Sequence, residues 1–249
     1  MSNIPKEVVI IEAVRTPIGT YKGSLKNIKA YQLGSVVIKE VLKRADLASE
    51  EVDEIIIGQV LTAGTGQNPA RQAAMEAGIP VSKPSHIVNQ VCGSGLRAVI
   101  SGLQSIKLGE SSKVITGGQE SMSITPNLIF NKNLKKNLEN ELVDTMVYDG
   151  LLDAFNNYHM GVTAENVAKQ FDISREQQDE FALDSQKKTQ DAIINGRFIK
   201  ELIEIDLNGN GLKKDEHPRN NLTLTDLQKL KTVFMENGTV TPGNSSGIN

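Results

Sequence analysis

Cysteine and aromatic residues are scarce in this chain of 249 residues, which has one cysteine, no tryptophan and 4% aromatic residues. A single cysteine excludes an internal disulfide bond and a zinc site built from several thiolates. The low aromatic content argues against a stacking platform for single-stranded nucleic acid. The net charge of −3 supplies no basic field that would attract nucleic acid to the molecule as a whole.

Signals for membranes and export are also missing. No apolar run approaches the roughly 20 residues that a transmembrane helix needs. The first residues, Met1 to Glu7, lack a cationic stretch followed by an apolar one, so we expect no secretory signal. We therefore expect a cytoplasmic protein with no membrane partner, long enough for one large or two small domains.

Segments typical of strands and of helices alternate in the first half of the chain. The continuous apolar runs at Val8–Ile11 and Ile55–Ile57 are typical of strands covered on both faces. We predict strands at 8–11, 53–60, 85–88 and 114–116, separated by helices at 33–45, 68–78 and 96–108. This alternation predicts an α/β layered fold with a mostly parallel sheet. The helix at 96–108 is apolar on nearly every side, so we expect it to be buried.

The pattern changes after Ser121. Residues 127–142 are polar, include Lys135-Lys136 and have no strand-like run, so they are predicted to leave the sheet. A short helix is expected at 163–171, and a longer one begins at the capping box formed by Ser174 and Gln177. A half-exposed strand at 203–207 and a turn at 208–211 follow.

Cys92 is the most informative residue, because it stands between a predicted strand and a predicted helix. The glycines after it, Gly93 and Gly95, open that helix. Such a corner exposes a side chain at the carboxyl end of a strand and directs free N–H groups and the positive end of the helix toward it. A thiolate and an oxyanion would both be stabilised there. The alternative is a buried cysteine that acts as a small apolar residue.

Other candidate motifs are weaker. His159 or His217 could be paired with Cys92 as a cysteine hydrolase, but we expect His217 to be a solvated loop residue and His159 to line a pocket. Gly243–Gly247 matches the G-x-S-x-G pattern of α/β-hydrolases but lacks the preceding strand and the following Asp and His. Gly64–Gly66 and Asn208–Gly211 lack the context of phosphate-binding loops and are expected to be turns.

Six stretches together resemble the thiolases, in particular the acetyl-CoA acetyltransferase (acetoacetyl-CoA thiolase) type. They occur in the family's order and cover almost the whole chain. The stretches are Arg15–Gly19, Gly66–Gln72, Asn89–Gly95, Gly117–Ser123, Tyr158–Asn166 and Gly243–Gly247.

The resemblance implies a thiolase-like layered α-β-α N-terminal half with an inserted loop domain. Its domains would be an α/β domain at 1–120, whose last strand would follow residue 249, a loop domain at 121–246, and the start of a return to the first domain at 247–249. The second half of the family's fold would be absent from these 249 residues.

The resemblance also implies a site and its partners. Cys92 would be the nucleophile that takes an acyl group from acyl-CoA, with its own N–H as one oxyanion donor. No cofactor is implied beyond the coenzyme A thioesters that serve as substrates, and family members are homo-oligomers, dimers or tetramers. The His159-Met160 pair is similar to that of short-chain, biosynthetic members. The positions matching the pantetheine channel are Leu151, His159, Met160, Phe234 and Ser246, and Arg219 matches one near the adenine end of coenzyme A.

The sequence departs from the family pattern in several places. Gln119 stands where a Met is usual, and Ser245 where an Ala is usual. The family's Asn-Glu-Ala-Phe segment, Gly-His-Pro histidine and second cysteine are not among these residues, so the chain resembles a C-terminally truncated thiolase. We expect the conversion of two acetyl-CoA into acetoacetyl-CoA and CoA, through an acyl-cysteine, to be impaired unless another chain supplies the second half. The alternatives are a non-catalytic remnant and a fragment of a degradative 3-ketoacyl-CoA thiolase.

Overall fold

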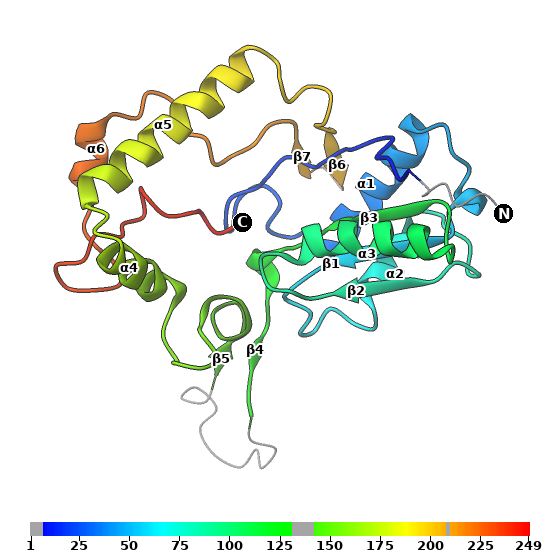
Figure 1. The fold of residues 1–249 in the computed structure, drawn as a ribbon, viewed down its shortest axis with the longest axis horizontal. Coiled ribbons are helices and arrows are strands. Elements are labelled where there is room, and N and C mark those ends of the chain that lie inside the picture. Colours follow the sequence, from blue (N-terminus) through cyan, green and yellow to red (C-terminus); the bar gives the residue numbers. More distant parts are fainter. Residues whose placement is uncertain (1–6, 131–141, 208–209) are drawn as a thin grey trace.

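A computed structural model describes residues 7–130, 142–207 and 210–249. Its centre is a parallel sheet of β1 (Glu54–Gly58), β2 (Ser85–Val88) and β3 (Val114–Gly118), in the order β2-β1-β3 (Figure 1). In the register of the central pairs, Gly58 lies opposite Val88 on one side and Gly118 on the other, so the three carboxyl ends are level. The predicted parallel α/β unit is confirmed.

Helices cover both faces of this sheet. One face carries α1 (Ala30–Arg44) and α2 (Pro69–Glu76), and the other carries α3 (Ser94–Leu108) (Figure 1). A short 3-10 turn, η1 (Ser49–Glu51), precedes β1. The start of α2 is fixed by Asn68, whose Oδ1 accepts the N–H of Arg71 at 3.1 Å, and by Pro69 in the first turn, where a missing N–H costs nothing.

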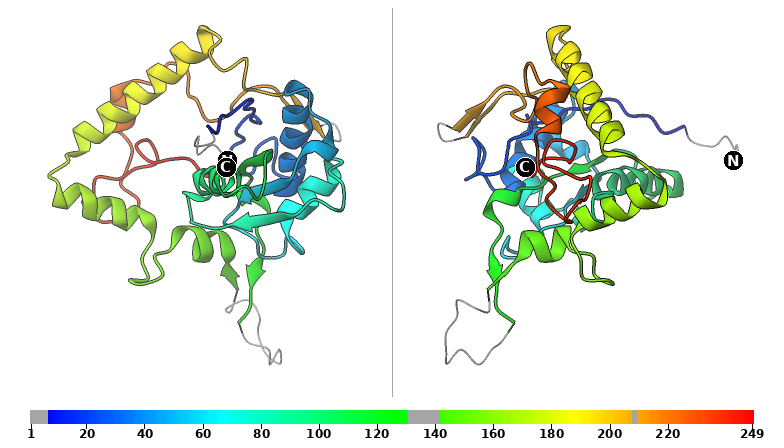
Figure 2. Two further views of the ribbon diagram at one scale, coloured as in Figure 1. Left: turned by 45° about the vertical axis from the view of Figure 1, so that its right-hand side comes forward. Right: turned by 90° about the vertical axis from the view of Figure 1, so that its left-hand side faces the viewer.

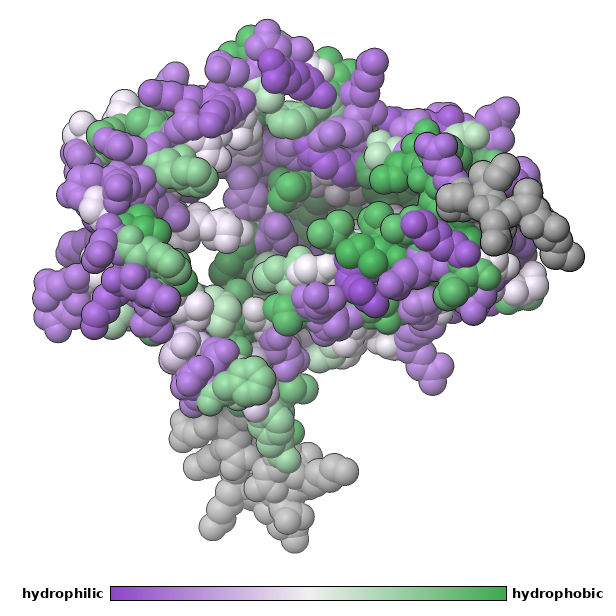
Figure 3. All heavy atoms as spheres, viewed as in Figure 1, coloured by the Kyte–Doolittle hydropathy of each residue, from purple (hydrophilic) through white to green (hydrophobic). Residues whose placement is uncertain are grey.

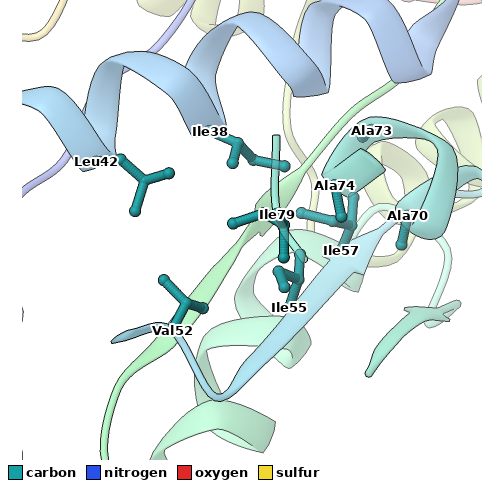
Figure 4. Packing of buried hydrophobic residues seen from close by; sticks show 9 residues of the cluster. All are labelled: Ile38, Leu42, Val52, Ile55, Ile57, Ala70, Ala73, Ala74 and Ile79. Carbon is teal, nitrogen blue, oxygen red and sulfur yellow. The ribbon is translucent and has the colours of Figure 1, made fainter. Parts of the chain in front are cut away.

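The main core lies between the sheet and the α1–α2 layer. Ile55 and Ile57, on one face of β1, are 0% and 3% exposed, and they pack against α1 and α2 through small alanines on α2 that bring the helix close to the strand (Figure 4). The buried members of this cluster are Ile38, Leu42, Val52, Ile55, Ile57, Ala70, Ala73, Ala74 and Ile79.

The prediction of a buried strand at 8–11 is wrong. This run forms no strand, and Val9, Ile10 and Ile11 are 65%, 77% and 67% exposed. Both sides of β1 are taken by β2 and β3, so another strand could join only at an outer edge, and residues 8–11 do not pair there. The apolar pattern marks side chains suited to burial but does not provide the neighbour that covers them.

The prediction that the helix at 96–108 is buried is also wrong. Only a stripe of small residues faces the sheet, where the absence of a side chain at Gly102 lets α3 approach Thr116 and Val114 of β3. Leu96 and Leu108 on the outer side are 68% and 75% exposed. Apolar residues therefore gather on the surface over α3 and the neighbouring N-terminal run (Figure 3).

After β3 the chain leaves the α/β unit, arches around one side through α5 and returns through β6 and β7 (Figures 1 and 2). Two expected helices are confirmed as α4 and α5, although α4 begins at Met160 rather than residue 163. Lys135-Lys136 and part of the expected turn at 208–211 lie outside the described residues. The elements in order are η2 (Met122–Ile124), β4 (Asn127–Leu128), β5 (Val143–Asp144), the π-helical turn η4 (Met146–Leu151), α4 (Met160–Gln170), α5 (Arg175–Ile194), β6 (Ile205–Leu207), β7 (Asn210–Leu212) and α6 (Leu224–Gln228).

Charged side chains tie the returning arch to the N-terminal segment. Arg15 donates two hydrogen bonds to Asp215, at 2.7 and 3.0 Å, and one to Glu201 at 2.6 Å. Next to them, Glu216 accepts hydrogen bonds from the N–H of Thr20 at 2.8 Å and the hydroxyl of Ser24 at 2.5 Å. Contacts across some 200 residues of sequence thus fix the loop that leads from the N-terminus to α1.

These contacts predict a stability that depends on pH. Burial opposes the ionisation of Asp215, but the hydrogen bonds from Arg15 and the Ile18 N–H outweigh it and lower the pKa of Asp215 below its usual value. A lowered folded-state pKa gives stability that is complete above the unfolded value, about 3.9, and is lost as pH falls through the folded value. Asp215→Asn should therefore cost on the order of 1–3 kcal/mol at pH 7.

Urea unfolding of the wild type and Asp215→Asn from pH 7 down to pH 2.5 would test this. The difference in free energy of unfolding should shrink as the pH falls below 4. A difference that is constant over this range would contradict the role assigned to the ionised carboxylate. Asp184→Asn, on the exposed side of α5, provides the control.

Candidate active site

Cys92 lies at the carboxyl ends of the three strands, in the loop between β2 and α3, and its side chain is exposed to solvent. It lines a cavity of about 480 Å³ together with residues of the segments that follow β1 and β3. The thiol is therefore accessible, and the alternative of a buried structural cysteine is wrong. Gly150 and Leu151, at the end of η4, also line the cavity. The cavity is therefore formed by the α/β unit together with the part of the chain that follows β3.

Glycines at the strand ends place the start of α3 against the sheet. A Cβ atom added at Gly58 would come within 2.4 Å of the carbonyl carbon of Ser94 and 2.5 Å of the Gly95 nitrogen. A Cβ atom added at Gly118, which is opposite Gly58 in the register, would lie 3.5 Å from the Gly95 Cα. Close packing of backbone on backbone thus fixes the helix start, and with it the position of Cys92.

The loop before α3 uses its own polar groups to hold this shape. Ser94 accepts the N–H of Gln90 at 2.9 Å and donates its hydroxyl to the Val91 carbonyl at 2.5 Å. Among the described residues, no acceptor lies within hydrogen-bond reach of the Cys92 N–H. The first turn of α3 contains no acidic side chain. The site therefore presents an unused backbone donor and the positive end of a 15-residue helix beside the thiol.

Val91, directly before Cys92, has a φ of +49°, in the left-handed region that β-branched residues rarely adopt. Its backbone is held there by the Asn89 side chain, which accepts the Val91 N–H at 2.9 Å, and by the Ser94 hydroxyl. A non-glycine residue in this conformation costs on the order of 1–3 kcal/mol. The loop at Cys92 therefore stores backbone strain.

Replacing Val91 with asparagine should relieve part of this strain, because asparagine tolerates positive φ. The Val91 side chain is 52% exposed, so little packing is lost. We expect Val91→Asn to raise the free energy of unfolding by about 1 kcal/mol in chemical denaturation. Val81→Asn removes another exposed valine, 75% exposed, that lacks a positive φ, and it should change stability by less than about 0.5 kcal/mol. A destabilised Val91→Asn would contradict the assignment of strain.

Glu120 is the other titratable side chain among the described residues that line the cavity. Its Oε2 accepts the N–H groups of Val60 and Leu61 at 2.9 and 3.2 Å, while its Oε1 is buried without a hydrogen-bond partner in the described structure. Burial raises the pKa of Glu120 above its ordinary value, against the effect of these N–H groups. The cavity thus contains a desolvated carboxyl group that is hydrogen-bonded through one of its two oxygens.

A pair of buried glutamines reinforces the same wall. Gln119 donates its amide to Gln59 Oε1 at 2.8 Å, and Gln59 donates to the Leu61 carbonyl at 2.9 Å. Both side chains are nearly inaccessible to solvent. The residue at 119, which departs from the methionine usual in the resembled family, therefore takes part in a polar network beneath the cavity.

The predicted site residues other than Cys92 and Leu151 do not line the cavity. His159 stacks on Phe234, with ring centroids 4.7 Å apart, and its Nδ1 accepts the Gly161 N–H. Gly161 has no side chain, and this allows the Phe234 ring to pack against its backbone. Met160 is partly exposed, and Ser246 and Arg219 are exposed; Arg219 donates its backbone N–H to Gln186. The structure thus brings Cys92 to Leu151 and His159 to Phe234.

Neither candidate histidine lines the cavity with Cys92. His217 is half-buried rather than solvated as predicted. Its Nε2 lies 3.0 Å from the Gly19 carbonyl, next to the hydrogen bonds that join Asp215 and Glu216 to the N-terminal segment. The geometry therefore gives no support to a cysteine hydrolase. The described residues contain no cluster of His, Cys, Asp or Glu that could hold a metal ion. In the same part of the chain no helix combines the length and apolarity needed to cross a membrane.

Sequence reasoning missed the roles of Gly58, Val91 and Glu120. Glu120 was visible only as part of the stretch Gly117–Ser123, and its position directly after a strand end was the available signal. Its burial depends on segments 60 residues earlier in the chain, so no local pattern could indicate it.

Comparisons with known proteins match almost the whole chain. A family model described as the thiolase N-terminal domain matches residues 8–249. An acetyl-CoA acetyltransferase of Rhizobium meliloti (strain 1021) is 47% identical over 100% of this chain and 64% of its own length. A probable acetyl-CoA acyltransferase of Staphylococcus aureus (strain COL) is 47% identical over 97% of this chain and 63% of its own length.

A solved structure gives the same relation. The crystal structure of the Bacillus anthracis acetyl-CoA acetyltransferase matches with a TM-score of 0.91 and 38% identity, covering 99% of this chain and 64% of that one. The chain therefore spans about 64% of the length of these relatives.

Proposed function

Because this chain belongs to the thiolase family, we propose that its Cys92 accepts an acyl group from acetyl-CoA and forms an acyl-cysteine. The observation that carries the proposal is the corner between β2 and α3. There an accessible thiol lies in a mostly apolar cavity beside an unused N–H and a helix N-terminus. These are the parts that a nucleophile and an oxyanion require.

In the proposed step the Cys92 thiolate attacks the carbonyl carbon of the thioester. The bond between that carbon and the sulfur of coenzyme A breaks, and coenzyme A leaves as a thiolate that takes up the proton lost by Cys92. Charge that develops on the carbonyl oxygen is stabilised by the Cys92 N–H and the positive end of α3. Attacking and leaving thiolates have similar basicity, so neither direction is strongly favoured.

We extend the proposal to the binding of coenzyme A. Leu151, in the Cys92 cavity, and Phe234, stacked on His159, would line the pantetheine channel, and the His159-Met160 pair would narrow the acyl pocket and favour short acyl groups. Met160 and Ser246 would border the pantetheine, and Arg219 would lie near the adenine nucleotide. The proposal also includes the division of the chain into an α/β domain at 1–120, a loop domain at 121–246 and the start of a return to the first domain at 247–249.

Condensation with a second acetyl-CoA requires a base that removes a proton from its methyl group. The three histidines are His86, His159 and His217, and none lines the cavity. We propose that these 249 residues perform acylation and that the base belongs to a second α/β half, in the same or another chain. The exposed apolar side of α3, with Leu96 and Leu108, is the surface on which that half would dock.

Intact-mass analysis after incubation with acetyl-CoA tests the proposal directly. We expect one acetyl group on the wild type and none on Cys92→Ser, with no acetoacetyl-CoA formed by the 249-residue chain. An unmodified wild type would overturn the acylation step. Formation of acetoacetyl-CoA that depends on Cys92 would overturn the need for a second half.

A further inference from the structure

The segments that follow β1 and β3 are cross-linked into one wall of the Cys92 cavity. The Gln119 N–H donates to the Gly58 carbonyl at 3.0 Å, which continues the β1–β3 pairing past the strand ends. Beyond that point side chains take over, because Glu120 binds the N–H groups of Val60 and Leu61. All of these residues line the cavity.

One carboxyl oxygen of Glu120, Oε1, is buried without a hydrogen-bond partner in the described structure, as is the amide oxygen of Gln119 beside it. A buried oxygen without a hydrogen-bond partner is unfavourable, so such atoms are rare and call for an explanation. Among the described residues that line the cavity there is no Lys, Arg or His to pair with a carboxylate. The contacts that Glu120 does make are those of Oε2 with the two N–H groups, which join the segment after β3 to the segment after β1.

We propose that Glu120 is a positioning residue for acyl transfer, which holds the Val60–Leu61 wall at the distance from Cys92 that a thioester requires. It acts through the wall rather than on the reacting atoms. The expected effect on acylation rests on the proposed function of Cys92. The contacts between Glu120 and the Val60–Leu61 wall do not. Misplacement of a reacting group by about 1 Å can cost 100-fold in rate, so the expected effect on acylation is about 10–100-fold.

The test compares two reactions of the same thiol in Glu120→Ala, Glu120→Gln and the wild type. Acylation by acetyl-CoA needs the shaped cavity, whereas alkylation by iodoacetamide needs only an accessible thiol. Glu120→Ala should slow acylation by about 10–100-fold and leave alkylation within about twofold. Glu120→Gln, which keeps an oxygen that can accept the Val60 and Leu61 N–H groups, should keep both rates. Glu110→Ala, at an exposed position after α3, controls for loss of a carboxylate.

Several results would overturn the proposal. Equal slowing of both reactions in Glu120→Ala would indicate general loss of structure, and unchanged acylation would show that the wall does not depend on Glu120. Acylation as slow in Glu120→Gln as in Glu120→Ala would show that accepting the Val60 and Leu61 N–H groups is not what positions the wall.

If the wild type is not acylated at all, the proposed function fails and hydrogen exchange decides this proposal separately. Exchange at the Val60 and Leu61 amides should then be at least tenfold faster in Glu120→Ala and unchanged in Glu120→Gln. Unchanged exchange in Glu120→Ala would overturn the positioning role.

Discussion

Gly58→Ala is expected to slow acylation of Cys92 about 100-fold and to destabilise the α/β unit. The new methyl group would lie 2.4–2.5 Å from backbone atoms of Ser94 and Gly95, which cannot rotate away as a side chain could. Either α3 shifts outward and carries Cys92 with it, or β1 separates from β3. Overpacking of this kind costs about 1–3 kcal/mol, and displacement of the nucleophile by about 1 Å adds a rate loss near 100-fold.

Gly117→Ala is the matched control, because Gly117 is also at the end of a strand but has no atom within 4 Å of an added Cβ. We expect Gly117→Ala to melt near the wild-type temperature and to react normally with acetyl-CoA. Intact-mass kinetics and thermal melts of both variants make the comparison. A Gly58→Ala protein that is acylated at the wild-type rate would refute the close packing of α3 on the strand ends.

Glu165→Ala is expected to cause the largest loss of stability in the arch. Glu165 lies on α4, is 6% exposed, and accepts the N–H of Thr239 at 2.9 Å, the Thr239 hydroxyl at 2.8 Å and the N–H of Val240 at 2.8 Å. Burial opposes its ionisation, but these donors outweigh burial and lower the pKa of Glu165. Removing the carboxylate leaves three donors without an acceptor, at a cost of roughly 3–5 kcal/mol in total.

Thermal unfolding of Glu165→Ala should show a fall of about 2–4 °C for each kcal/mol lost. Glu165→Gln keeps one acceptor oxygen and should lose less than Glu165→Ala. Asn166→Ala, at the next, exposed position of the same helix, should melt near the wild type. If Glu165→Ala also melted near the wild type, the segment at 239–246 would have to be held by other contacts, such as the bond from Asn244 to Asp179.

The sequence predicted the parallel sheet well because its signals are local. Ile55–Ile57 is a short apolar run with glycine after it, and the corner at Cys92 is marked by the glycines that follow. The capping box at Ser174 and Gln177 likewise marks the first turn of α5, where the Ser174 hydroxyl accepts the Gln177 N–H. Each of these features depends on residues within a few positions of one another.

The failures concern burial by distant or absent neighbours. Val9–Ile11 and the outer side of α3 have apolar side chains, but the described structure places nothing over them. The small residues Ala98 and Gly102, which do face the sheet, give a weaker apolar signal than Leu96, which does not. The strain at Val91 and the burial of Glu120 depend on the folded loop and on pairs 60 residues apart, which no local pattern reports.

The hydrogen bonds from Arg15 to Glu201 and Asp215 have a consequence for the order of folding. Its partners are separated by 186 and 200 residues in sequence, whereas the strands of the sheet and the helices between them are close neighbours along the chain. Contacts that close such long loops form late, because the chain loses conformational entropy before the ion pair contributes its stabilising free energy. The α/β unit should therefore assemble first, with Cys92 already at the start of α3. The cavity beside the thiol is completed only when Gly150, Leu151 and the N-terminal segment held by Arg15 are in place.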